Sequence, residues 1–241
     1  MSSEPEIVRV ELPADLEVAL RRVLRRCGLS PSEFITEAVI EKLAARDLSD
    51  RAGGAVPRHR CLLYEGPPSK QLPTLAAVIC QKIEENYRCL YLNSPTMVTG
   101  MASYLAAQGR DVLEDTKQGR LVLSSDQHNA EDGLFDVDAM LQGLGDALDQ
   151  ALKDGYRGLW ASGDMTWEFG RSGNFSRLLE YEWRLEEFFG SHPELEGICQ
   201  YHVDTLPPEA IQHGRDAHPA IFVNETLSLV NLHYHPRNAP A

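Results

Sequence analysis

The residues best suited to chemistry lie in one turn, Gly66 to Leu72, which follows the apolar run Cys61 to Tyr64. The phosphate-binding loop of an ATPase has the form GxxxxGK[ST]. Its glycines let backbone N–H groups surround the phosphates, its lysine reaches the terminal phosphates, and its hydroxyl holds Mg²⁺. Here the turn reads GPPSKQL, with one glycine, two prolines that remove amide donors, and glutamine directly after Lys70. We therefore expect no ATP hydrolysis and no enzymatic activity, while nucleotide binding without hydrolysis stays open.

Further candidate residues follow apolar runs that read as strands, at the ends where a parallel sheet usually binds its ligand. Asp164 stands where an ATPase would hold magnesium, although carboxylates at strand ends are common. Aromatic and carboxylate groups at one edge would suit a small, partly apolar or cationic molecule. The alternative is that Tyr64 and Trp167 cap the core while the carboxylates are solvated. The predicted ligand-binding set is His59, Tyr64, Glu65, Lys70, Asn93, Asp164, Trp167, Tyr201 and His202.

Metal and nucleophile chemistry find little support in the sequence. Eight histidines are present, and His202 falls near Cys199 and Asp204, but the chain has neither an HExxH nor a CxxC pattern. His233 and His235 form an HxH that suits one face of a strand or a frayed end. Ser162 lacks the first glycine of a GxSxG elbow. Cys–His chemistry stays open, although Cys61 and Cys89 fall at buried strand positions. We expect neither a metal ion nor a cofactor.

The elements that must position these residues alternate between strands and helices from His59 onward. Two four-residue apolar runs flank a segment of helical period between 59 and 93, which is typical of a right-handed βαβ unit. The pattern predicts strands at 61–64, 89–92, 121–123, 158–161, 197–203 and 221–223. It predicts helices at 75–87, 96–108, 136–153, 175–189 and 208–216, with a polar loop at 127–133. We expect an α/β fold with a mostly parallel sheet covered by helices on both faces.

The first 46 residues form a separate unit. Residues 7–12 alternate like a strand, a helix is predicted from about 14 to 27, and Ser30 to Glu33 is a capping box with proline at the first helical position. This unit resembles the ribbon-helix-helix family, in VRVELP and GLSPSEFI. The resemblance implies a dimer whose paired strands enter the major groove of DNA. The predicted DNA-binding residues are Arg9, Glu11, Arg21, Arg22, Arg25, Ser30 and Ser32.

Glu11 is awkward beside Arg9, because it also repels phosphate. The cluster of arginines between Arg21 and Arg26 can also be interpreted as an ordinary solvated helix face. A dimerisation module, or an antitoxin-like domain that binds a protein, is the alternative to DNA binding. Residues 47–58 are polar, with two glycines and a proline, and read as a linker before a second domain at 59–241.

Composition limits the partners. The net charge is −13, so the surface as a whole does not attract nucleic acid or anionic membrane, and DNA binding would need a local basic site. The five cysteines are odd in number and most fall in apolar positions, which favours free thiols in a reducing compartment. We see no signal peptide and no apolar run long enough to cross a bilayer. We expect a cytoplasmic protein with no membrane partner.

Six stretches taken in order resemble the MEDS domain, the sensory domain named for methanogens and methylotrophs and typified by the regulator DcmR. They are HRCLLYE from His59, RCLY from Arg88, GYRG from Gly155, GDMTW from Gly163, LEYE from Leu179 and CQY from Cys199. The resemblance covers roughly residues 57–235. It implies a RecA-like fold and a signalling role, often fused to a DNA-binding or kinase domain. DcmR-type proteins suggest halogenated or one-carbon ligands.

The sequence thus predicts a transcriptional regulator. A ribbon-helix-helix dimer would bind operator DNA, and a non-hydrolysing RecA-like domain would receive a small molecule or a partner protein. The alternative is a signalling adaptor that dimerises through its N-terminal domain and docks a protein without binding DNA. The predicted partners are operator DNA, an unknown small molecule, a second copy of the chain in a homodimer or larger assembly, and a protein signalling partner.

Overall fold

The computed structural model describes residues 57–126, 135–170, 175–224, 227–231 and 233–234, together with Glu17, Leu20, Arg21, Leu24, Ser30–Ser32, Phe34 and Ile35. The chain divides into two units, Met1–Ala52 and Gly53–Ala241. In the first unit, the residues described between 17 and 24 are helical, as are those from Pro31 to Ile35, and Phe34 N–H donates to the carbonyl of Ser30 at 3.1 Å. The predicted strand and Arg9, Glu11, Arg22 and Arg25 lie outside the described residues. The ribbon-helix-helix arrangement, the linker and the exact domain bounds therefore stay predictions.

The second unit is built on one seven-stranded sheet in the order β3-β2-β4-β5-β1-β6-β7. Six strands run parallel, and β7 pairs antiparallel with β6 at one edge. The strands are β1 (His59–Tyr64), β2 (Tyr87–Leu92), β3 (Leu121–Ser124), β4 (Gly158–Asp164), β5 (Leu195–His202), β6 (Ala220–Asn224) and β7 (Leu227–Val230). This confirms the predicted α/β fold with a mostly parallel sheet.

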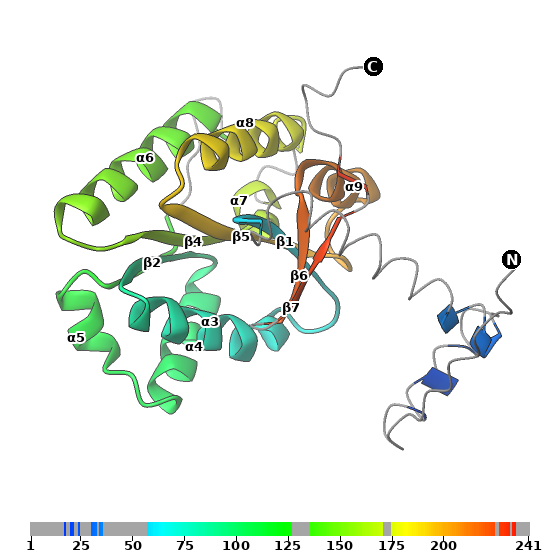
Figure 1. Ribbon diagram of the computed structural model, residues 1–241, viewed down its shortest axis with the longest axis horizontal. Helices are drawn as coiled ribbons and strands as arrows, with labels where there is room; N and C mark the ends of the chain where they lie inside the picture. The colour runs from blue at the N-terminus through cyan, green and yellow to red at the C-terminus, as the bar shows by residue number, and fades with distance from the viewer. Residues whose placement is uncertain are drawn as a thin grey trace, which may run out of the picture. The chain divides into compact units, whose positions relative to one another are not determined.

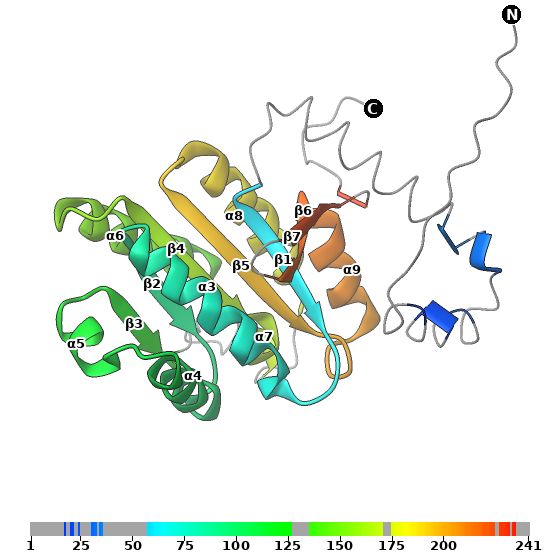
Figure 2. The same ribbon diagram turned by 60° about the horizontal axis from the view of Figure 1, so that its bottom comes forward.

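Helices cover both faces of the sheet, as predicted. Helices α3 and α4 lie on one face, and α6, α8 and α9 lie on the other (Figures 1 and 2). The helical bounds are η1 (Pro68–Gln71), α3 (Leu72–Glu84), α4 (Pro95–Ala107), α5 (Val112–Lys117), α6 (Val137–Lys153), α7 (Met165–Gly170), α8 (Leu178–Ser191) and α9 (Pro208–Ala217). None of the helices in the described part of the chain has both the length and the apolar character needed to cross a membrane.

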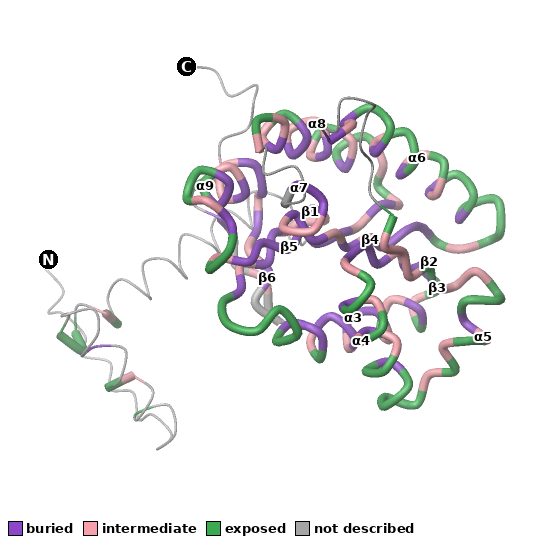
Figure 3. Tube along the Cα trace, turned by 180° about the vertical axis from the view of Figure 1, so that it is seen from behind, coloured by how far each residue is buried: buried purple, intermediate pink, exposed green. Residues whose placement is uncertain are grey.

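Strand alternation divides the apolar side chains between two cores. Along β1, Leu62 and Tyr64 pack with α3 and α4, whereas Cys61 packs with α6 and α8 on the opposite face. Successive residues of a strand point to opposite faces, so a strand covered on both sides must be apolar nearly throughout. Figure 3 shows the central strands buried and the outer helix surfaces exposed.

Most predicted elements shift by only a few residues. The helix predicted to reach Tyr87 ends at Glu84, because Asn86 adopts the left-handed conformation with φ 65° and Tyr87 already belongs to β2. The strand predicted at 158–161 continues to Asp164, and α7 begins at the next residue. The sequence pattern missed α5, α7 and β7, each of six residues or fewer.

Two glycines make a matched test of packing. A Cβ atom on Gly158 would lie 2.0 Å from the carbonyl oxygen of Glu194, whereas a Cβ on Gly190, on the exposed side of α8, would meet nothing within 4 Å. We predict that Gly158→Ala lowers the free energy of unfolding by about 2–3 kcal/mol or more. Gly190→Ala should leave it unchanged or raise it by about 0.5–1 kcal/mol. Urea unfolding followed by circular dichroism measures both values, and equal stabilities would contradict the strand packing described here.

Candidate functional site

The carboxyl edge of the sheet contains two points where neighbouring strands continue to opposite faces. Strands β1 and β2 lead to α3 and α4 on one face, while β4 and β5 lead to α7, α8 and α9 (Figure 1). Because β1 neighbours β5 and β2 neighbours β4, both pairs are topological switch points, where open α/β sheets usually bind ligands. The candidate site is therefore the edge formed by the ends of these four strands.

The carboxyl group of Asp164, the last residue of β4, lies at the centre of this edge. Its Oδ2 accepts hydrogen bonds from the hydroxyl of Tyr64 on β1 at 2.9 Å and from Nδ2 of Asn93, just after β2, at 3.2 Å. Its Oδ1 accepts from the backbone N–H groups of Thr166 and Trp167, at 2.8 and 3.1 Å. Burial raises the pKa of Asp164, and the hydrogen bonds from Tyr64, Trp167 and Thr166 oppose the rise. Both carboxyl oxygens are thus already hydrogen-bonded within the protein.

The turn after β1 is also held by hydrogen bonds to other groups of the protein. Nε2 of His202, at the end of β5, lies 2.7 Å from the carbonyl oxygen of Gly66, and its ring stacks on Tyr64 with centroids 4.9 Å apart. The N–H of Gly66 donates to Oδ2 of Asp204 at 2.7 Å. In a phosphate-binding loop, amides of this kind would point at the anion. Here Asp204 accepts the hydrogen bond from that N–H group. The residues Pro68–Gln71 form a 3₁₀ turn.

The structure brings together Tyr64, Asn93, Asp164 and His202, while Trp167 contributes its backbone amide through α7. Glu65 and Lys70 are exposed and lie beside Tyr64 around a crevice of about 410 Å³ outside the end of β1. Most of the predicted set therefore shares one edge. Whether these residues bind a ligand stays a prediction.

His59 and Tyr201 do not reach this edge. His59 is the first residue of β1, so it lies at the amino end of a six-residue strand. Tyr201 lies near the carboxyl end of β5, but its hydroxyl donates to Oε1 of Glu182 on α8. Neighbouring positions of a strand face opposite sides of the sheet, and the sequence pattern did not indicate which side would face the crevice.

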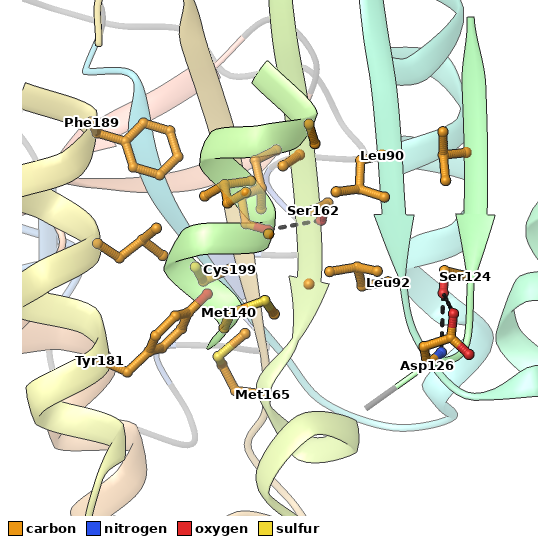
Figure 4. Close-up of a pocket in the computed structure, with 18 residues that line it drawn as sticks. Leu90, Leu92, Ser124, Asp126, Met140, Ser162, Met165, Tyr181, Phe189 and Cys199 are labelled. Carbon is orange, nitrogen blue, oxygen red and sulfur yellow. Dashed lines mark hydrogen bonds between the residues drawn. The ribbon is translucent and has the colours of Figure 1, made fainter. Parts of the chain in front are cut away.

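A second hollow lies on the sheet's α6 and α8 face rather than at its edge (Figure 4). The cavity has a volume of about 260 Å³. Leu90 and Ala161 are paired on the central strands β2 and β4, yet both are only partly buried, because their side chains face this space. The other lining side chains are mostly apolar and come from β2–β5, α6 and α8; among them are Leu92, Met140, Leu144, Tyr181, Leu185 and Phe189.

Residues 58–219 match the model of the family described as MEDS, the MEthanogen/methylotroph, DcmR Sensory domain, and this match spans more than half of the chain. The chain belongs to the MEDS family. Its sequence matches no curated protein. Among solved structures, it is similar to an uncharacterized protein from Pyrococcus horikoshii in complex with an unknown peptide, with 13% identity, a TM-score of 0.48, and coverage of 78% of this chain and 89% of that one.

One residue of the MEDS domain that sequence reasoning missed lies next to Asp164. Glu168 on α7 is 1% exposed, and neither carboxyl oxygen has a hydrogen-bond partner among the described residues. Burial, together with the nearby Asp164, raises the pKa of Glu168 from 4.5 to about 8. The segment read as a strand end followed by a loop, so no periodicity indicated that this side chain would be buried.

A buried polar chain also runs through the sheet of the MEDS domain. Nε2 of Gln71 donates to Oε1 of Gln200 at 3.3 Å, and Nε2 of Gln200 donates to the hydroxyl of Ser162 at 2.9 Å. Ser162 in turn donates to the carbonyl of Ile198 at 2.8 Å. This hydroxyl is therefore fully engaged and is not an activated nucleophile, as the missing elbow glycine suggested.

Glu168→Gln tests the effect of this buried acid. A carboxyl group whose folded pKa of about 8 exceeds its unfolded value of 4.5 stabilises the fold below pH 4.5 and loses that contribution as the pH rises toward 8. We predict that Glu168→Gln is about 1–3 kcal/mol more stable than the unmodified chain at pH 8, and shows a smaller difference at pH 5. Urea unfolding at both pH values measures this, with Glu209→Gln on the exposed side of α9 as the control. A variant that is less stable at pH 8 would contradict the burial of a neutral acid.

Proposed function

We propose that this chain is a regulator whose MEDS domain receives a small, mostly apolar molecule in the cavity between the sheet and helices α6 and α8. Occupancy of the cavity then changes how the N-terminal unit, as a ribbon-helix-helix dimer, binds operator DNA. The MEDS family match supports the sensing role, and the cavity is the observation that carries the choice of ligand. The domain acts as a receiver and not as an ATPase.

The lining of the cavity favours an apolar ligand. Asp126, which lines one end, is exposed, whereas Phe189 at the other end is buried (Figure 4). A ligand could therefore enter past β3 and come to rest against α8. Ligand pockets are commonly about 300–1,000 Å³, so a space of about 260 Å³ suits a small molecule. This agrees with the halogenated or one-carbon compounds that the family resemblance implies.

The position of the cavity offers a route for the signal. Met140 and Leu144 reach it from α6, and Tyr181 and Leu185 reach it from α8. A ligand that binds one arrangement of these helices more tightly than another shifts the population toward that arrangement. The shift can be no larger than the difference in binding free energy between the two arrangements.

The carboxyl edge supports the absence of ATP hydrolysis. Asp164 already accepts four hydrogen bonds, and Asp204 occupies the N–H of Gly66, so a triphosphate with its magnesium would have to displace the protein's own groups. The loop also lacks the hydroxyl after Lys70. ATP turnover that Lys70→Ala abolishes would overturn this part of the proposal.

Replacing either of two alanines with methionine separates cavity binding from nonspecific effects. Ala161 lines the cavity, whereas Ala139, on the exposed side of α6, does not. We predict that dichloromethane or benzene raises the melting temperature of the full chain in a saturable way, because a ligand that binds only the folded state stabilises it. Ala161→Met should abolish the shift by filling the space, and Ala139→Met should keep it. No saturable shift in the unmodified chain, or an equal shift in both variants, would contradict the proposed ligand site.

DNA binding by the N-terminal unit is tested with genomic fragments in a mobility-shift assay. We predict that Arg9→Ala keeps the dimer but weakens operator binding by about 5- to 150-fold and reduces discrimination against unrelated DNA, since an arginine that reads a guanine edge contributes about 1–3 kcal/mol. Arg46→Ala removes the same charge and should weaken binding to operator DNA and to unrelated DNA by the same factor. Identical effects of the two substitutions would argue against base reading by Arg9.

The second candidate function is an adaptor, which the net charge of −13 favours because an acidic surface docks protein partners more readily than DNA. In that case, the chain would bind none of the genomic fragments, and the N-terminal unit would only dimerise. A shift of DNA mobility that responds to the cavity ligand separates the regulator from the adaptor.

A further inference from the structure

Four buried side chains with metal-binding atoms meet on the α8 and α9 face of the sheet, away from the carboxyl edge. They are His59 at the start of β1, Cys199 on β5, Glu182 on α8 and His218 just after α9. Their ligand atoms all lie within 4.8 Å of one another, and all four residues are buried. No sequence motif marks this cluster, because the residues are 17 to 159 positions apart and no local spacing links them.

We propose that His59, Glu182, Cys199 and His218 form a closed tetrahedral site for a divalent transition metal ion, Zn²⁺ fitting best. Thiolate and imidazole ligands suit zinc, and four protein ligands with no open position are typical of structural sites. The ion would join β1, β5, α8 and α9, which are far apart in the sequence. This inference does not rest on the proposed ligand-sensing function, and the two sites share one residue, Cys199.

Three of the six distances between ligand atoms match such a site, and all six are within 4.8 Å. Nε2 of His59 lies 3.4 Å from Sγ of Cys199 and 3.6 Å from Oε2 of Glu182, and Nε2 of His218 lies 3.4 Å from the same Oε2. Metal–ligand bonds of about 2.0–2.3 Å in tetrahedral geometry place neighbouring ligand atoms about 3.3–3.6 Å apart. An ion at the centre would need little rearrangement of these side chains.

The outer contacts orient both imidazoles toward the centre. Nδ1 of His59 lies 2.8 Å from Oε2 of Glu186, and Nδ1 of His218 lies 2.7 Å from the carbonyl oxygen of Gly214. Each acceptor holds the ring proton on Nδ1, so the lone pair of Nε2 faces inward. Metal-binding histidines almost always show this pairing of the second nitrogen with a carboxylate or a carbonyl. The remaining oxygen of Glu182, Oε1, is held by the hydroxyl of Tyr201.

Two of the four inward-facing atoms lack hydrogen-bond partners of their own. Nε2 of His218 and Oε2 of Glu182 are fully buried without a hydrogen bond among the described residues, and such atoms are costly to leave unpaired. A dication with one thiolate, one carboxylate and two neutral imidazoles has no net charge, so the filled site suits an apolar interior.

The experiment measures metal in the full chain, purified without chelators from cells grown with zinc. The expected result is about one zinc per chain by mass spectrometry. X-ray absorption at the zinc edge should then show one sulfur at about 2.3 Å and nitrogen or oxygen neighbours at about 2.0–2.1 Å. This readout uses the unmodified chain, so it does not depend on a variant that folds. A folded chain that carries no metal, or zinc without a sulfur neighbour, would overturn the proposal.

A cysteine pair supplies the matched control. Cys61 is a buried strand cysteine whose register partner is Cys199, but it is not among the four ligands. In protein loaded with Co²⁺, the unmodified chain and Cys61→Ser should show the sulfur-to-cobalt charge-transfer band and strong visible bands of a tetrahedral site. Cys199→Ser should lose the charge-transfer band. Its persistence in Cys199→Ser, or its loss in a folded Cys61→Ser, would place the metal elsewhere.

Discussion

The arrangement of the MEDS domain depends on one buried carboxyl group. Asp164 ends β4 and accepts hydrogen bonds from β1, from the residue after β2, and from the first amides of α7. Burying a carboxylate is costly unless its oxygens are hydrogen-bonded, so all four donors are needed together. The ends of β1, β2 and β4 therefore meet at Asp164, and the protein's own groups supply its hydrogen bonds.

That constraint favours the face of the sheet over its edge as the place where a ligand binds. The same parallel sheet has two unlike hollows, a polar crevice outside β1 and an apolar cavity under α6 and α8. Polar groups at the edge are largely satisfied by one another, whereas the cavity leaves the apolar side chains of Leu90 and Ala161 without close packing on one side. Empty apolar space in a protein interior is uncommon, so it is a stronger sign of a ligand than satisfied polar groups are.

The sequence predicted the alternation of strands and helices, because apolar runs and helical periodicity are local properties. It also placed Tyr64, Asn93, Asp164 and His202 at strand ends, and these residues meet because parallel strands share one carboxyl edge. It did not predict the direction of Tyr201, since that depends on which of two apolar faces each residue of a fully buried strand takes. Short elements such as α7 were missed for lack of periodicity, and with them the buried Glu168.

The cluster of His59, Glu182, Cys199 and His218 shows a different limit of sequence reasoning. Its members come from four elements, and only the packing of α8 and α9 against β1 and β5 brings them together. Metal sites with local spacing can be read from a sequence, but a site assembled by tertiary packing cannot. The expectation of no metal ion, drawn from the sequence, rested on local spacing alone.

The central claim is that the MEDS domain binds its ligand in the cavity on the sheet face and not at the turn after β1. Methyl and amide NMR spectra of the full chain test this claim most directly. Titration with benzene should shift the methyl resonances of Leu90 and Leu144 in a saturable manner, while titration with ATP and Mg²⁺ leaves the amide resonances of Gly66 and Lys70 in place. Saturable shifts of Gly66 and Lys70 with the nucleotide, together with unmoved cavity methyls, would contradict it.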